Sequence, residues 1–183
     1  MVTVVVFILA WMPLRSKSQD SVSYRINGEK VADFLKMGDD IDSVLLILSK
    51  KYKILKSGTP ECRGCENRSN VYYVMDNKGL LFTIEPGWSS SNSHKIVRFT
   101  TQRKEFITQE GIRPGMSFGD ICEKYRISNI NYSGGLWVYV IVSGFNGSFS
   151  IEVPENVKLT PTDYVNKIPH DAVIKEIILI YFE

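Results

Sequence analysis

Two stretches of the chain carry apolar residues at helical spacing. In residues 41–48 the apolar side chains recur three and four positions apart, and residues 118–125 repeat the arrangement. Such spacing places these side chains on one face of an α-helix. Both runs end in Lys-Tyr, a basic residue and Ile, at residues 51–54 and 124–127. The pattern therefore predicts two amphipathic helices in equivalent positions.

Each predicted helix precedes segments that alternate apolar and polar residues. Residues 71–74 and 82–85 flank a turn-like stretch, and residues 138–141 and 149–152 repeat this hairpin at the same offset. Alternation of this kind gives a strand one apolar face and one polar face. A third β-rich run closes each half, at residues 95–99 and 176–181, and residues 22–26 predict a short strand ahead of the first helix. The fold class expected is α+β: two tandem αβββ units, each a helix packed on one face of a three-stranded antiparallel sheet.

The repeat predicts units at residues 19–104 and 105–183, after a leader at residues 1–18. Residues 2–12 carry no charge and are too few to span a bilayer, but they fit the apolar region of a signal peptide. Small residues precede Gln19 at the positions that a cleavage site requires. Basic residues follow the apolar run instead of preceding it, so a buried N-terminal strand is the alternative. We expect an exported protein, periplasmic or secreted.

Removal of the leader changes the charge of the chain. The full sequence has 22 basic and 20 acidic residues, and cleavage would remove Arg15 and Lys17, leaving 20 of each. A formally neutral chain lacks the positive field that binds phosphates, so we expect no nucleic-acid partner. We also expect no stable membrane span after leader removal. The oligomeric state does not follow from the sequence.

Three cysteines follow the leader. In an oxidising compartment two of them would pair. A local Cys62–Cys65 disulfide is one arrangement, and Cys122 with either of the others is another. The Cys-x-x-Cys spacing also resembles half of a zinc site, but no second pair accompanies it. We expect no metal and no cofactor.

Residues 107–117, Ile-Thr-Gln-Glu-Gly-Ile-Arg-Pro-Gly-Met-Ser, precede the second helix, which ends in Tyr125 before a hairpin. This arrangement resembles the small envelope modules of the BamE (SmpA/OmlA) family. Two such units in tandem resemble the beta-lactamase inhibitor protein fold, over residues 25–183 in layout. The first unit keeps Met37-Gly38-Asp39 of the motif. The resemblance implies an exported binding module that holds a protein partner with an open sheet face or a rim of loops, and it implies no catalytic residues.

We therefore expect a non-catalytic binding protein, of inhibitor or immunity type, that recognises another protein. Aromatic side chains are favoured anchors in protein interfaces. The candidate contact residues, near predicted loops and strand starts, are Trp88, Tyr132, Trp137, Tyr139 and Tyr72. Tyr72 and Tyr139 are expected to share a sheet face, because their hairpins align; the alternative is that both rings fill the core.

Two other functions are compatible with the sequence. One is a structural module for envelope assembly or cell-wall association, which the BamE resemblance implies. The other is a thiol-dependent enzyme that uses Cys65 or Cys122, which would require a thiol of lowered pKa.

Overall fold

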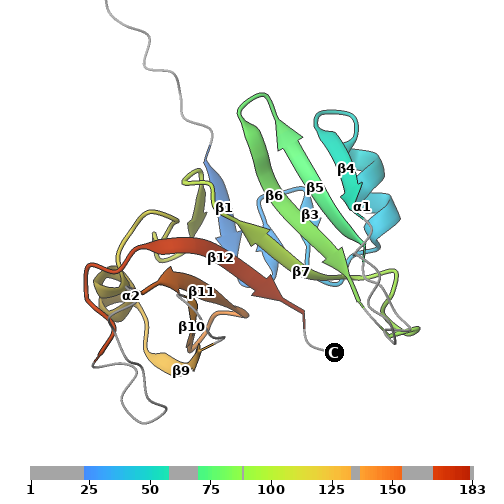
Figure 1. The fold of residues 1–183 in the computed structure, drawn as a ribbon. Helices are drawn as coiled ribbons and strands as arrows, with labels where there is room; N and C mark the ends of the chain where they lie inside the picture. The colour runs from blue at the N-terminus through green and yellow to red at the C-terminus, as the bar shows by residue number, and fades with distance from the viewer. Residues whose placement is uncertain (1–22, 58–69, 88, 133–136, 154–166, 182–183) are drawn as a thin grey trace, which may run out of the picture.

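The computed structural model describes residues 23–57, 70–87, 89–132, 137–153 and 167–181 (Figure 1). The leader expected at residues 1–18 lies outside these ranges, as do Cys62, Cys65 and Trp88. The elements in chain order are β1 (Tyr24–Asn27), β2 (Lys30–Val31), β3 (Leu35–Lys36), α1 (Ile41–Leu48), β4 (Lys53–Ser57), β5 (Val71–Asp76), β6 (Gly79–Pro86), β7 (Ile96–Thr101), β8 (Phe106–Thr108), α2 (Phe118–Lys124), β9 (Ile127–Tyr132), β10 (Trp137–Val142), β11 (Gly147–Glu152) and β12 (Ile174–Ile180).

One antiparallel sheet joins the two halves of the chain. Its strand order is β4-β5-β6-β7-β12-β11-β10-β9, so the last strand of each half lies at the centre. There β7 and β12 pair from Thr101 opposite Ile177 to Arg98 opposite Ile180. The two strands cross the middle of the molecule side by side (Figure 1). A single surface therefore runs across all eight strands.

The prediction of an α+β fold of two helix-plus-three-strand units was wrong. The described residues are mostly β: four strands of the large sheet follow each helix, and together they form one eight-stranded sheet. A second sheet has four short strands in the order β3-β2-β1-β8, of which β1 matches the short strand expected at residues 22–26. The unit boundary near residue 104 stays a prediction.

The strands that the sequence analysis missed in the large sheet are its two edges, β4 and β9. Each begins within or directly after the Lys-Tyr-basic-Ile segment that was interpreted as a helix end. The helices stop earlier, at Leu48 and Lys124. Edge strands are largely exposed, and only Ile130 is fully buried among the residues of the two strands. They therefore lack the run of apolar residues that marks a central strand.

The helices begin where the pattern predicted. The Asp40 side chain accepts a hydrogen bond from the Ser43 backbone N–H ahead of α1. Ahead of α2, Ser117 and Asp120 form a capping box, in which each side chain accepts from the other residue's backbone N–H. These caps satisfy backbone donors that have no partner inside the helix.

The hydrophobic core lies on one face of the large sheet. The buried residues of α1 and α2 belong to the same cluster as Phe82, Phe99 and Phe149 of the sheet. The small sheet packs against this cluster too, since the Phe106 ring of β8 lies 5.6 Å from that of Phe99. We call this side of the large sheet the core face.

Candidate binding hollow on the large sheet

The opposite side of the large sheet, the hollow face, carries the alternate residues of the central strands. On β10 and β11, Tyr139 lies opposite Ser150, one position away from the core pair Val140 and Phe149. Side chains alternate across a strand, so Tyr139 and Ser150 point away from the core. Ile178 belongs to the same face: it is only 2% exposed, yet it is not part of the core cluster.

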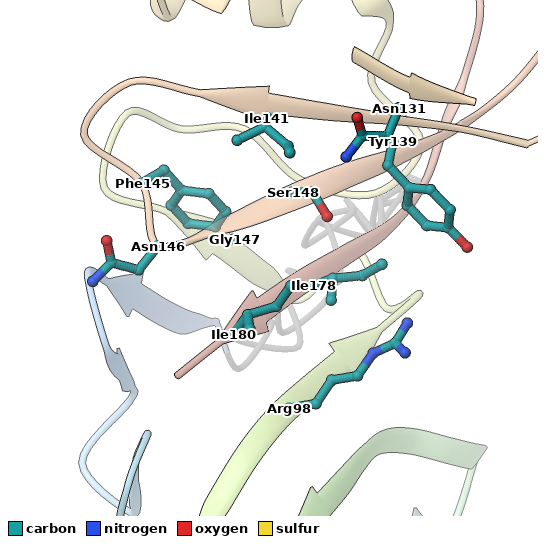
Figure 2. Close-up of a pocket in the computed structure, with 10 residues that line it drawn as sticks. All are labelled: Arg98, Asn131, Tyr139, Ile141, Phe145, Asn146, Gly147, Ser148, Ile178 and Ile180. Atoms are coloured by element: carbon teal, nitrogen blue, oxygen red, sulfur yellow. The ribbon is translucent and has the colours of Figure 1, made fainter. Parts of the chain in front are cut away.

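Two adjoining cavities lie on the hollow face. One, of about 410 Å³, is lined by residues of β7, β9, β10, β11 and β12: Arg98, Asn131, Tyr139, Ile141, Phe145, Asn146, Gly147, Ser148, Ile178 and Ile180 (Figure 2). The other, of about 490 Å³, is lined by Glu85, Gly87, Ser89, Asn92, Val97, Arg98, Ile180 and Tyr181. Both contain Arg98 and Ile180, and we call the two together the hollow. Its volume is within the range of small-molecule sites.

Small residues form the floor of the hollow. Gly147 and Ser148 of β11 line the smaller cavity together with larger residues such as Tyr139. A side chain at Gly147 is impossible without movement, because a Cβ atom there would lie 2.0 Å from the Ile178 carbonyl oxygen. Short side chains flanked by long ones leave a depression in a sheet, so the sequence of β11 accounts for this one.

A β-bulge brings Arg98 and Val97 to the same side of β7. Glu85 of β6 lies opposite Arg98, but the next pair is Pro86 with Ile96, which leaves Val97 as the extra residue. Such a bulge turns two consecutive side chains towards one face. Both residues consequently line the larger cavity.

Three buried polar atoms of the hollow face have no hydrogen-bond partner within the described part of the chain. They are the Arg98 Nε, the Thr100 Oγ1 and the Ser150 Oγ, and Ser150 is only 1% exposed. Burial of a polar group without a partner is costly, and native proteins contain few such groups. All three lie on the hollow face, and one of them, Arg98, lines both cavities.

The charged groups of the hollow face are few. The Arg98 Nε lies 3.7 Å from the Glu85 Oε1, which is an ion pair but too long for a hydrogen bond. Gln102 donates a hydrogen bond of 2.8 Å to the carboxylate of Glu176 on β12. Near the hollow the face thus presents the Arg98 guanidinium, with incomplete hydrogen bonding, and the carboxylates of Glu85 and Glu176. Further along the same face, Glu152 lies opposite Trp137 and pairs with Lys175.

The structure brings together two of the predicted contact residues. Trp137 and Tyr139 lie two positions apart on β10 and so share the hollow face. Trp137 is 39% exposed, and Tyr139 lines the smaller cavity. Tyr132 is 45% exposed at the end of edge strand β9, opposite Val138, and therefore lies on the other face of the strand.

Tyr72 does not share a face with Tyr139. Val74 lies opposite Phe82 and Val140 lies opposite Phe149, so Val74 is the equivalent of Val140. Tyr72 packs instead against the core cluster. The alignment of the two hairpins was wrong by one residue, and in a strand this moves a side chain to the opposite face. The core alternative was the right one for Tyr72.

The remaining predicted residues add no chemistry to the hollow. Cys122 is a free thiol on α2, part-buried against the core, and burial raises its pKa. The suggested Cys62–Cys65 disulfide and Trp88 lie outside the described residues. Within the described ranges, no three His, Cys, Asp or Glu side chains gather to hold a metal ion. The same ranges contain no helix long and apolar enough to cross a membrane.

Sequence reasoning missed two polar residues that line the hollow, Arg98 and Ser148. Arg98 was assigned to the polar face of its strand, and Ser148 lay just outside the predicted strand. One signal was available: β11 carries serines on the face opposite its core residues, where a water-facing strand usually carries larger polar side chains.

Comparison with known proteins finds a similar fold. No family model matches the chain, and no curated protein matches it. The crystal structure of the uncharacterized protein yfeY from Escherichia coli aligns with a TM-score of 0.58 at 16% sequence identity, over 87% of this chain and 99% of that chain. This likeness extends over nearly the whole fold and shows the fold alone. The resemblance to BamE modules stays a prediction.

Proposed function

We propose that this chain is an exported, non-catalytic binding protein, and that the hollow face of its large sheet is the binding surface. The observation that carries the proposal is the group of buried, unpartnered polar atoms of Arg98, Thr100 and Ser150 on this face, of which Arg98 lines both cavities of the hollow. A fold that keeps such atoms without a partner loses stability. A ligand that supplies hydrogen bonds would recover this loss on binding.

Support for a protein partner comes from the aromatic rim. Trp137 and Tyr139 lie together on the hollow face of β10, whereas Tyr132, exposed on the neighbouring edge strand, lies on the other face. Interface residues of highest energetic weight are commonly tryptophan and tyrosine beside a pocket. This is the inhibitor-type or immunity-type function that the sequence resemblance implies.

An affinity capture tests the protein-binding function. The full chain, tagged at its C-terminus, serves as bait in an envelope extract of its own host, and the captured proteins are identified by mass spectrometry. We expect one stoichiometric partner, with capture weakened at least about tenfold by the double substitution Trp137→Ala and Tyr139→Ala. The matched control is Leu46→Ala on α1, where the side chain is 67% exposed. The proposal is contradicted if the double substitution leaves capture unchanged. It is also contradicted if Leu46→Ala weakens capture as much as the double substitution does.

The mass of the purified protein tests export. A full chain produced in its host should lose residues 1–18, so that Gln19 becomes its N-terminus. Retention of Met1, with all of the protein in the cytoplasm, would contradict this part of the proposal.

The envelope-assembly function is the second candidate. It predicts fractionation with an outer-membrane complex, whereas the first candidate predicts free protein. The thiol-enzyme alternative loses support at Cys122, because burial raises the pKa of this thiol while catalysis requires a lowered one.

A further inference from the structure

The hollow has a polar side and an apolar side. Figure 2 shows the Arg98 guanidinium, the Tyr139 phenol and the Ser148 hydroxyl extending towards one side of the smaller cavity. Ile141, Phe145 and Ile180 lie towards the other side, where Asn146 adds a polar amide beside Phe145. Ile178 lies between the two groups. An occupant that fits both sides is amphipathic.

The polar side favours an anionic group. A guanidinium has five N–H donors in a fixed fork that matches a carboxylate. Within the described residues, the contact of Arg98 with a charged group is the 3.7 Å approach of its Nε to Glu85, and that nitrogen makes no hydrogen bond. A carboxylate held by two charge-assisted hydrogen bonds would use donors that the fold leaves available.

The acidic neighbours limit the charge of the occupant. Glu85 and Glu176 lie on the same face as Arg98. Glu85 is on β6, which pairs with β7, and Glu176 is on β12. A dianionic phosphate at Arg98 would meet the carboxylate of Glu85, and the cavity linings offer one guanidinium to balance these negative charges. A monocarboxylate leaves the smaller charge imbalance, and so it is the favoured anion.

The apolar side and the volume favour an alkyl chain. The apolar lining of the smaller cavity consists of branched aliphatic side chains and one phenylalanine, and the cavity volume is about 410 Å³. Burial of each methylene group of a ligand there would contribute about 0.8 kcal/mol. The lining of the hollow includes no cysteine and no histidine that could activate its serine hydroxyls, and the described residues contain no metal-ligating cluster.

We propose that the hollow binds a small amphipathic monocarboxylate of the fatty-acid class, with the carboxylate at Arg98 and the alkyl chain over Ile178 towards Phe145. The proposal rests on the hollow face being the binding surface proposed above, and it adds a small-molecule ligand to the protein partner. It assigns Arg98 as the residue that selects a carboxylate over a neutral head group.

Titration calorimetry of the full chain tests this assignment, with decanoate as the probe and decanol as its neutral match. We expect one decanoate per chain, bound at least about tenfold more tightly than decanol, because hydrogen bonds to charged groups are the stronger ones. Arg98→Gln should abolish this preference while leaving decanol binding within about threefold. Arg98→Lys keeps the positive charge but loses the two-pronged guanidinium geometry, so it should retain part of the preference for decanoate. Arg113→Gln, at an exposed arginine ahead of α2, is the matched control and should change nothing.

Three results would overturn the assignment: equal affinity for decanol and decanoate, a preference that survives Arg98→Gln, or no binding of either probe. The urea midpoint of each variant shows whether it is folded, so a loss of binding by unfolding is recognised. If neither probe binds but protein capture remains sensitive to the Trp137 and Tyr139 substitutions, the fatty-acid assignment fails and the proposed binding function stands.

Discussion

Thr100 and Thr101 offer a direct test of the unpartnered polar atoms in the hollow face. The two residues are neighbours on β7 and point to opposite faces of the sheet. The Thr100 Oγ1 is buried and has no partner among the described residues. The Thr101 hydroxyl is also buried, but it donates to the Leu81 carbonyl at 2.9 Å and accepts from the Arg103 N–H at 3.2 Å. The same substitution, threonine to valine, should therefore have opposite effects at the two positions.

The magnitudes follow from the hydrogen bonds. Valine matches threonine in shape and suits a β-strand, so the hydroxyl is the main difference. Thr100→Val removes a buried polar group without breaking a hydrogen bond, and it should raise the free energy of unfolding by about 1 kcal/mol. Thr101→Val leaves the Leu81 carbonyl and the Arg103 N–H without their partner, and it should lower the same free energy by about 1–3 kcal/mol.

Urea unfolding monitored by tryptophan fluorescence measures both variants against the parent chain. A shift of the midpoint at constant slope reports the stability change. If Thr100→Val destabilises the protein as much as Thr101→Val does, the Thr100 hydroxyl is hydrogen-bonded in solution. The argument that the hollow face contains polar groups in need of a ligand would then be refuted for this residue.

Three further predictions concern the rest of the fold. Phe99→Ala should lower the free energy of unfolding by about 3–5 kcal/mol, because the ring is fully buried against Phe82 and Phe106. Urea unfolding measures this change, and a loss below about 1 kcal/mol would show that the ring is not tightly packed. Hydrogen bonds from Ser117 lower the pKa of Asp120, so its contribution to stability is present above the ordinary carboxyl pKa and is lost as the pH falls through the lowered value. The stability difference between the parent chain and Asp120→Asn should therefore shrink on acidification, and urea midpoints that differ equally at neutral and acid pH would contradict the capping box. Burial raises the pKa of the Cys122 thiol, so alkylation of Cys122, followed by peptide mass spectrometry, should be slower than alkylation of glutathione at the same pH; faster labelling would restore the thiol-enzyme hypothesis.

Local pattern was sufficient for the elements of the fold that bury an apolar face. The starts of both helices were predictable, because their caps and apolar spacing lie within a few residues of one another. The hairpins β5–β6 and β10–β11 were predictable because their strands alternate. The edge strands β4 and β9 were not, since exposed positions leave little apolar signal.

The candidate site was predictable only in part. Tyr139 and Trp137 were recognised as aromatic residues near a strand start, and they do lie together on the hollow face. Arg98 carries no signal in its own neighbourhood of the sequence. Its role arises from the bulge at Val97 and from strand β12, which is about 80 residues further along the chain.

The sequence by itself determined where both helices begin and which segments form the two hairpins, and in β6 and β11 it also indicated which side chains face the core. Only the tertiary structure decided that β7 pairs with β12, which merges two expected sheets into one and creates the hollow at their junction. The physical reason is the range of the interactions. Helix caps and side-chain alternation act between residues close in the chain, whereas pairing of the final strand of each half depends on packing around a core shared by residues far apart in sequence.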